Sequence, residues 1–112
     1  MIVPPYLYQV DSLSISTIEG YDAELSCYLI VGTQNSQIIS WSWLFNGQTI
    51  PADGRYVVTN YADSTKLTIK SSKTTDKGNF NCYAANTYGS HSRETYLRVK
   101  SKKNLKFIVL LI

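Results

Sequence analysis

The chain has 112 residues, a length that suits one domain with a modest core. Its net charge of +3 comes from the end of the chain, because residues 1–99 hold seven basic against eight acidic residues and the excess lies in Lys100, Lys102, Lys103 and Lys106. A near-neutral domain excludes a basic nucleic-acid surface. Two cysteines are too few for a small scaffold built on many disulfides.

The first part of the chain predicts β-strands, because apolar and polar residues alternate in short runs that turn residues separate. Residues 5–10 and 13–18 predict a first strand split in two, and residues 19–22 predict a turn. In the strand that follows, alternate side chains are apolar and should point to one side: Ala23, Leu25 and Cys27.

The middle of the chain predicts a loop at residues 31–37 and then a third strand. Asn46-Gly47 ends this strand with a strong signal for a tight hairpin turn. The apolar side of the strand is expected to be formed by Ile39, Trp41 and Trp43.

The last part predicts strands that begin at Arg55, span residues 66–70, contain Phe80 and Cys82, and span residues 94–100. We expect a hairpin tip near residues 88–90. No segment has a convincing helical period. The inward residues of these strands should be Leu67, Ile69, Phe80, Cys82, Ala84, Leu97 and Val99.

One pattern runs through these strands. Trp43 follows Cys27 by sixteen positions, and Asp76-x-Gly78-x-Phe80-x-Cys82 leads into the second cysteine. This arrangement is typical of an immunoglobulin-type β-sandwich, in which a Trp packs against a disulfide that joins the sheets. A Cys27–Cys82 bond would close a loop of about 56 residues and contribute roughly 4 kcal/mol in the loop-closure view.

More of the chain resembles the I-set branch of the immunoglobulin superfamily, over residues 5–100. The matching pieces are Glu19-Gly20, Cys27, Trp43-Leu44-Phe45-Asn46-Gly47, Gly54-Arg55-Tyr56, Leu67-Thr68-Ile69, Asp76-x-Gly78-x-Phe80-x-Cys82-x-Ala84-x-Asn86-x-x-Gly89 and Leu97-x-Val99. The resemblance implies a two-sheet, Greek-key sandwich with one inter-sheet disulfide and a core framework of Trp43, Phe80, Leu67 and Ile69.

The resemblance also implies a structural ion pair between Arg55 and Asp76. Phe80 departs from the pattern, since the family usually has Tyr there, and that hydroxyl bonds back to the backbone. We therefore expect packing alone to hold this corner. The stretch from Ala84 to Ser90, with Leu97 to Ser101, is similar to the membrane-proximal domain of the basigin and neuroplastin group.

No catalytic chemistry is indicated. The single histidine, His91, falls in the predicted hairpin with no partner set for a serine triad, and two Cys with one His make no zinc site. Phosphate-loop and calcium-loop motifs are absent, and so is an Asn-x-Ser/Thr glycosylation acceptor. We expect no enzyme, no cofactor and no metal.

The outward side of the third strand and the last two strands is the candidate binding face. It would show Leu44, Tyr83, Tyr96 and Arg98, and Tyr and Arg are enriched at binding hot spots. The competing interpretation is an ordinary strand face, where Tyr and Arg are good strand residues.

These features predict a non-enzymatic adhesion or recognition domain on the extracellular side of the plasma membrane, within a larger immunoglobulin-superfamily protein. The partner would be a protein, with homophilic and heterophilic binding both open. The alternatives are a structural I-set spacer of an intracellular muscle protein and a secreted immune-modulating domain.

The two ends of the chain are expected to lie outside the domain. Residues 1–4 read as a linker or a vector-derived remnant. Residues 101–112 are basic and then apolar, and two interpretations stay open: the start of a transmembrane segment, through which the chain would associate with a membrane, or an extension of the last strand.

Overall fold

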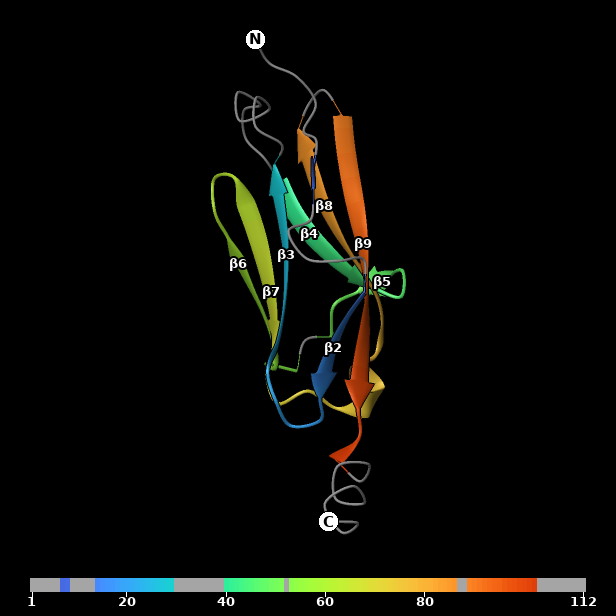
Figure 1. Ribbon diagram of the computed structural model, residues 1–112. Coiled ribbons are helices and arrows are strands. Elements are labelled where there is room, and N and C mark those ends of the chain that lie inside the picture. Colours follow the sequence, from blue (N-terminus) through green and yellow to red (C-terminus); the bar gives the residue numbers. More distant parts are fainter. Residues whose placement is uncertain (1–6, 9–13, 30–39, 52, 87–88, 103–112) are drawn as a thin grey trace.

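A computed structural model describes residues 7–8, 14–29, 40–51, 53–86 and 89–102, and these residues form two packed sheets (Figure 1). The four-stranded sheet has the order β1 (Leu7–Tyr8), β3 (Ala23–Leu29), β7 (Ser64–Ile69), β6 (Tyr56–Asn60). The five-stranded sheet has the order β2 (Ser14–Ile18), β9 (Gly89–Lys100), β8 (Gly78–Asn86), β4 (Ser40–Phe45), β5 (Gln48–Thr49). The predicted all-β, immunoglobulin-like sandwich is confirmed.

The first strand is split between the two sheets, as its interrupted pattern predicted. β1 pairs with β3 antiparallel, whereas β2 pairs with β9 in parallel, from Ser14 opposite Tyr96 to Ile18 opposite Lys100. The N-terminal part of the chain therefore contributes an edge strand to each sheet.

The core lies between the sheets and is built by strand alternation. Its buried members are Ala23, Leu25, Cys27, Leu29, Trp43, Leu67, Ile69, Phe80, Cys82, Ala84 and Leu97. A disulfide joins Cys27 on β3 to Cys82 on β8, and so links the two sheets. Trp43 pairs with Cys82 across the β4–β8 ladder and belongs to the same cluster.

The Trp43 side chain also carries a polar contact that the sequence pattern did not predict. Its indole Nε1 donates a hydrogen bond to Thr65 Oγ1 at 3.0 Å, and the Thr65 hydroxyl donates to Asn60 Oδ1 at 2.7 Å. Thr65 is fully buried on β7, so this bond connects the five-stranded sheet to the four-stranded sheet through the core.

Several predicted boundaries were wrong by a few residues. β9 begins at Gly89 and not at Glu94, because its ladder with β8 continues without a break up to Asn86 opposite Gly89. β6 begins at Tyr56, one residue after Arg55, and β7 spans 64–69 where 66–70 was expected.

A short 3₁₀ helix, η1 (Thr74–Asp76), precedes β8 where no helix was expected. The Asp76 carboxylate holds this turn, because its Oδ2 accepts a hydrogen bond from the Lys73 backbone N–H at 2.7 Å.

Other predictions lie outside the described residues: the 31–37 loop, Ile39, residue 88 of the hairpin tip, and the two terminal segments apart from Ser101 and Lys102. Among the residues that the structure does describe, no helix has the length and apolar character needed to cross a membrane.

Candidate functional site

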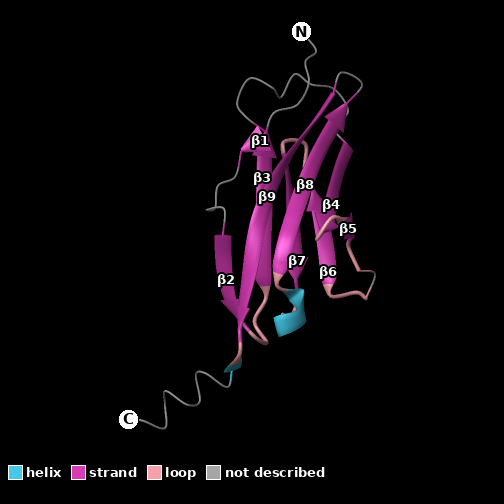
Figure 2. Cartoon of the chain, turned by 90° about the vertical axis from the view of Figure 1, so that its right-hand side faces the viewer, coloured by secondary structure: helices cyan, strands magenta, loops and turns pink. Residues whose placement is uncertain are grey.

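The outward face of β4, β8 and β9 collects the predicted binding residues on one surface, and Figure 2 shows these strands side by side. The ladder register places Ser42 opposite Tyr83, and Asn81 opposite both Leu44 and Glu94. We call this surface the β4-β8-β9 face, made of Ser42, Leu44, Asn81, Tyr83, Glu94, Tyr96 and Arg98.

The two tyrosines of this face are half-buried and stand apart. Tyr83 pairs with Ser92 and Tyr96 pairs with Asn79, so four rungs of the β8–β9 ladder, about 13 Å, separate them. Arg98 is exposed, and its guanidinium carbon lies 5.3 Å from the centroid of the Tyr96 ring. This distance suits a cation–π contact, which holds the Arg98 charge over an aromatic surface.

Leu44 differs from its prediction as an exposed apolar residue, because it is half-buried in the structure. It lies between neighbours on both sides, with Thr49 of β5 opposite on one strand and Asn81 of β8 opposite on the other. Leu44 is therefore a half-buried apolar residue of the face, with a polar residue opposite it on each neighbouring strand.

A buried carboxylate supports the end of the sandwich from which β8 starts. Asp76 is 2% exposed, and both of its oxygens accept hydrogen bonds from Arg55: Nη1 to Oδ2 and Nη2 to Oδ1, each at 2.9 Å. The Tyr56 hydroxyl also donates to Asp76 Oδ1. Arg55 Nη1 reaches the Lys70 carbonyl at 3.2 Å as well, so the structure brings Arg55 and Asp76 together and ties them to the end of β7.

These contacts set the pKa values of the cluster. Burial opposes ionisation of Asp76, but hydrogen bonds from Arg55, Tyr56 and the Lys73 backbone outweigh it and lower the pKa of this carboxyl. The hydrogen bond to Asp76 raises the pKa of Arg55. Burial, followed by the hydrogen bond to Asp76, raises the pKa of Tyr56 from 10.0 to about 12.

Phe80, which replaces the usual family tyrosine, is fully buried. Its ring stacks on Phe45 with centroids 4.5 Å apart and planes 20° from parallel. The role of Tyr56 was missed by sequence reasoning, although Gly54-Arg55-Tyr56 belonged to the matched pattern. A tyrosine hydroxyl does form a hydrogen bond near the start of β8. It belongs to Tyr56 on β6, and its acceptor is the Asp76 side chain and not the backbone.

The structure places His91 on a strand and not in the predicted hairpin loop. It lies on β9 opposite Ala84, half-buried, and burial followed by the nearby Arg93 charge lowers its pKa. Across the described ranges, three or more His, Cys, Asp or Glu side chains do not gather where they could hold a metal ion.

Comparison with known proteins agrees with this architecture. The family model of the immunoglobulin I-set domain matches residues 9–99. Neural cell adhesion molecule 1 of Homo sapiens is 37% identical over 65 residues, which cover 58% of this chain and 8% of that protein. Myosin-binding protein C, fast-type, of Homo sapiens is 29% identical over 83 residues, covering 74% of this chain and 7% of that protein.

Solved structures show the same fold. The titin I-band fragment I67-I69 superposes with a TM-score of 0.78 at 23% identity, covering 90% of this chain and 34% of that chain. Titin domains Z1Z2, solved in complex with telethonin, superpose with a TM-score of 0.76 at 21% identity, covering 90% of this chain and 50% of that chain.

The chain spans less than a tenth of the length of the curated relatives described above. None of these matches confirms the resemblance to the basigin and neuroplastin group.

Proposed function

The chain belongs to the immunoglobulin I-set family, and from this membership we propose that it is a cell-surface adhesion or recognition domain of a larger protein. It would act by protein–protein binding, without enzymatic chemistry, cofactor or metal. The β4-β8-β9 face would be the contact surface. The partner would be a protein, either a second copy or a different molecule.

The observation that carries this proposal is that Tyr83, Tyr96 and Arg98 all lie on one outward sheet face, with the exposed Arg98 guanidinium beside the Tyr96 ring. Large aromatic side chains and Arg supply contact area with few rotatable bonds, and they dominate the energetics of many interfaces. Identity to neural cell adhesion molecule 1 supports the adhesion assignment. The Cys27–Cys82 disulfide supports an oxidising, extracellular compartment.

The second candidate is a structural I-set spacer of an intracellular muscle protein. The identity to myosin-binding protein C over 83 residues favours it, and so does the lack of an Asn-x-Ser/Thr acceptor. A spacer would need no recognition by the β4-β8-β9 face, so loss of its tyrosines would have no functional effect. A secreted immune-modulating domain would use the face but would lack a membrane segment in the full-length chain.

We further propose residues 5–100 as the folded unit, with residues 1–4 as a linker or a vector-derived remnant. Residues 101–112 would be a basic stem that leads into an apolar segment and associates with a membrane. Flotation of the full chain with liposomes, against a chain that ends at Lys100, distinguishes a membrane stem from a strand extension.

Removal of both tyrosines tests the binding face directly. We expect Tyr83→Ala with Tyr96→Ala to weaken binding at least tenfold, because hot-spot tyrosines each contribute on the order of 2 kcal/mol. The measurement is binding of a fluorescent tetramer of the domain to intact cells of the tissue that expresses it. Circular dichroism of the purified variant shows whether it is folded.

The matched control removes two exposed tyrosines elsewhere, Tyr21→Ala with Tyr61→Ala, which are 64% and 52% exposed. This control should bind like the unchanged domain. A folded Tyr83/Tyr96 variant that binds cells as well as the control would exclude this face as the contact surface.

A further inference from the structure

β6 is the outer strand of the four-stranded sheet and pairs on one side only, with β7. The Arg55 carbonyl accepts from Lys70 N–H at 2.8 Å, and Tyr61 N–H donates to the Ser64 carbonyl at 2.8 Å. Backbone groups alternate in direction along a strand, so the odd-numbered residues face β7. The backbone N–H and C=O groups of Tyr56, Val58 and Asn60 therefore point to the open side, away from β7.

This edge lacks the features that usually prevent pairing with another chain. Native edge strands are protected by charge, proline, a bulge or shortness. β1 and β5 have two residues each, whereas β6 has five, with neither a charged residue nor proline among them. Within the described strands, the exposed large apolar residues are both in β6: Val57, 38% exposed, and Val58, 42% exposed.

β2 is the other five-residue edge, and it differs from β6 in two ways. Its isoleucines are half-buried, and Glu19 follows it directly. The charge that precedes β6 is Arg55, which is bound to Asp76 at 2.9 Å and lies 3.4 Å from Asp53. On the neighbouring strand, Lys66 lies opposite Thr59, and its Nζ is 3.9 Å from Glu24 Oε2. A strand that approaches β6 therefore meets an edge with no charge of its own, and both cations beside it already have acidic partners.

We propose that β6 pairs antiparallel with β6 of a second copy of this chain, on a twofold axis through Val58. This register places Val58 opposite Val58 and Tyr56 opposite Asn60, so all three outward-facing backbone positions pair with their counterparts. Val57 lies opposite Thr59, and a β-branched pair of this kind stabilises a sheet. The strand is thus complementary to itself, with no like charges inside the ladder.

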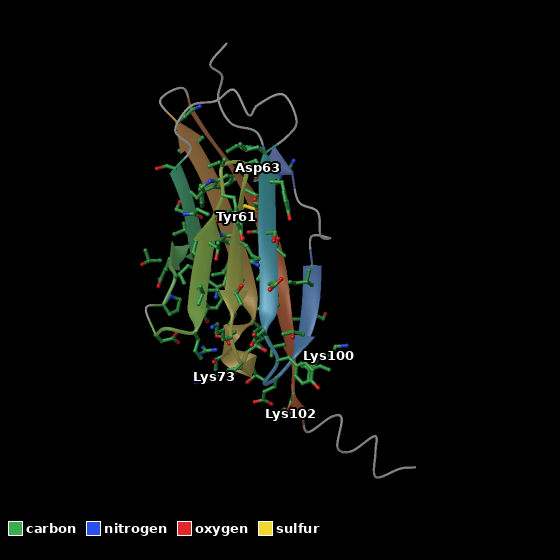
Figure 3. The ribbon with its side chains drawn as sticks, turned by 90° about the vertical axis from the view of Figure 1, so that its left-hand side faces the viewer. Tyr61, Asp63, Lys73, Lys100 and Lys102 are labelled. Carbon is green, nitrogen blue, oxygen red and sulfur yellow. A yellow bond between two sulfur atoms is a disulfide. The ribbon has the colours of Figure 1, made fainter. Side chains whose placement is uncertain are left out.

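The pairing would join two four-stranded sheets into one continuous sheet. Figure 3 views this sheet face on, with Tyr61 labelled just beyond the end of β6. The β4-β8-β9 face belongs to the other sheet and stays free for a partner. The inference therefore does not depend on the proposed function, and each can fail without the other.

Sedimentation velocity of the full chain tests the dimer, from about 10 µM to about 1 mM, a range that detects a dimer with a dissociation constant as weak as about 1 mM. We expect the sedimentation coefficient to rise with concentration toward that of a dimer. Val58→Lys places a charge on the twofold axis and should abolish the rise. Thr49→Lys puts the same charge on the exposed β5 edge and should leave it unchanged.

A sedimentation coefficient that is constant over the whole range would overturn the proposal. So would a Val58→Lys variant that dimerises like the Thr49→Lys control. Urea unfolding of both lysine variants checks that each is folded at the concentrations used.

Cysteine cross-linking tests the register without depending on Val58→Lys. In the proposed pairing, residue 57 faces residue 59 in a non-hydrogen-bonded pair, where Cα atoms lie about 4.5 Å apart, within reach of a disulfide. A mixture of Val57→Cys and Thr59→Cys chains should form covalent dimers under mild oxidation, and either variant alone should form few. Cross-linking of one variant alone as efficiently as the mixture would contradict a twofold at Val58.

Discussion

Asp76 is a buried carboxylate whose charge is satisfied by a guanidinium, a phenol and a backbone amide. Its contact with Arg55 followed from the family pattern, because both residues occupy matched positions. The Tyr56 contact could not be predicted, since its direction depends on how the β5–β6 loop brings the strand to η1. The same holds for Trp43 and Thr65, whose hydrogen bond depends on the packing of one sheet on the other.

Tyr56→Phe should lower the free energy of unfolding by about 1.5–3 kcal/mol at pH 7, the range for a hydrogen bond to a charged group. Tyr56 has a pKa of about 12 in the folded chain against 10.0 as its ordinary value. Its stabilising contribution is therefore complete below pH 10 and is lost as the pH rises toward 12. Urea unfolding at pH 7, 10 and 11.5 should show the difference between the two proteins shrinking.

The acid side of the same cluster has the opposite sign. Because the pKa of Asp76 is lowered from 3.8, its contribution is present above about pH 4 and is lost as the pH falls below that value. The alkaline measurement decides whether the Tyr56–Asp76 hydrogen bond stabilises the fold. If the difference in free energy of unfolding between the unchanged protein and Tyr56→Phe stayed constant from pH 7 to 11.5, this hydrogen bond would not contribute to stability.

At the scale of elements, the strands followed from alternation and the hairpin turn from Asn46-Gly47, which has φ values of 50° and 81°. The start of β9 could not be predicted, because its first residues are polar and Ser-rich, a composition typical of loops, and only the pairing with β8 shows that they form a strand.

The need for glycine at position 78 also depends on the fold. The sequence motif contains Gly78, but the motif does not show why a side chain is excluded there. The β4–β5 turn approaches it so closely that a Cβ there would lie 2.6 Å from Asn46 Oδ1 and 2.8 Å from Phe45 Cε1.

Gly78→Ala should therefore destabilise the domain by about 2–4 kcal/mol, through backbone strain at φ +149° and the clash with the β4–β5 turn. Gly54→Ala is the matched control, with a positive φ of +83° but nothing within 4 Å of the added Cβ, and should cost about 1 kcal/mol. Thermal and urea unfolding measure both. Equal losses would show that the turn yields and that the close approach has no energetic consequence.

At the scale of the whole molecule, the described part of the chain begins near one pole of the sandwich, at β1, and ends at the opposite pole. β1 lies at one end of the sandwich, whereas β9 ends at Lys100 at the opposite end, where Lys102 also lies (Figures 2 and 3). Neighbouring domains attached at the poles would leave the outer faces of both sheets accessible. This geometry suits an adhesion array and a passive spacer equally well.

Cys27, Trp43 and Cys82 were enough to predict the fold, because the core admits few alternatives. They could not identify a partner, since they are buried in the core at 1%, 5% and 0% exposure and leave almost no surface for another molecule to contact. Partner recognition depends on surface residues such as Tyr83, which strand propensity alone also favours. Cell compartment therefore separates the competing functions better than any core residue.

The redox state of the cysteines in protein from its native source tests the extracellular assignment most directly. Cells are lysed in a thiol-blocking reagent, and mass spectrometry then identifies the peptides that contain the two cysteines. A cell-surface domain should yield a Cys27–Cys82 linked peptide with little alkylated thiol. Recovery of both cysteines as alkylated free thiols would contradict a cell-surface domain and favour the intracellular spacer.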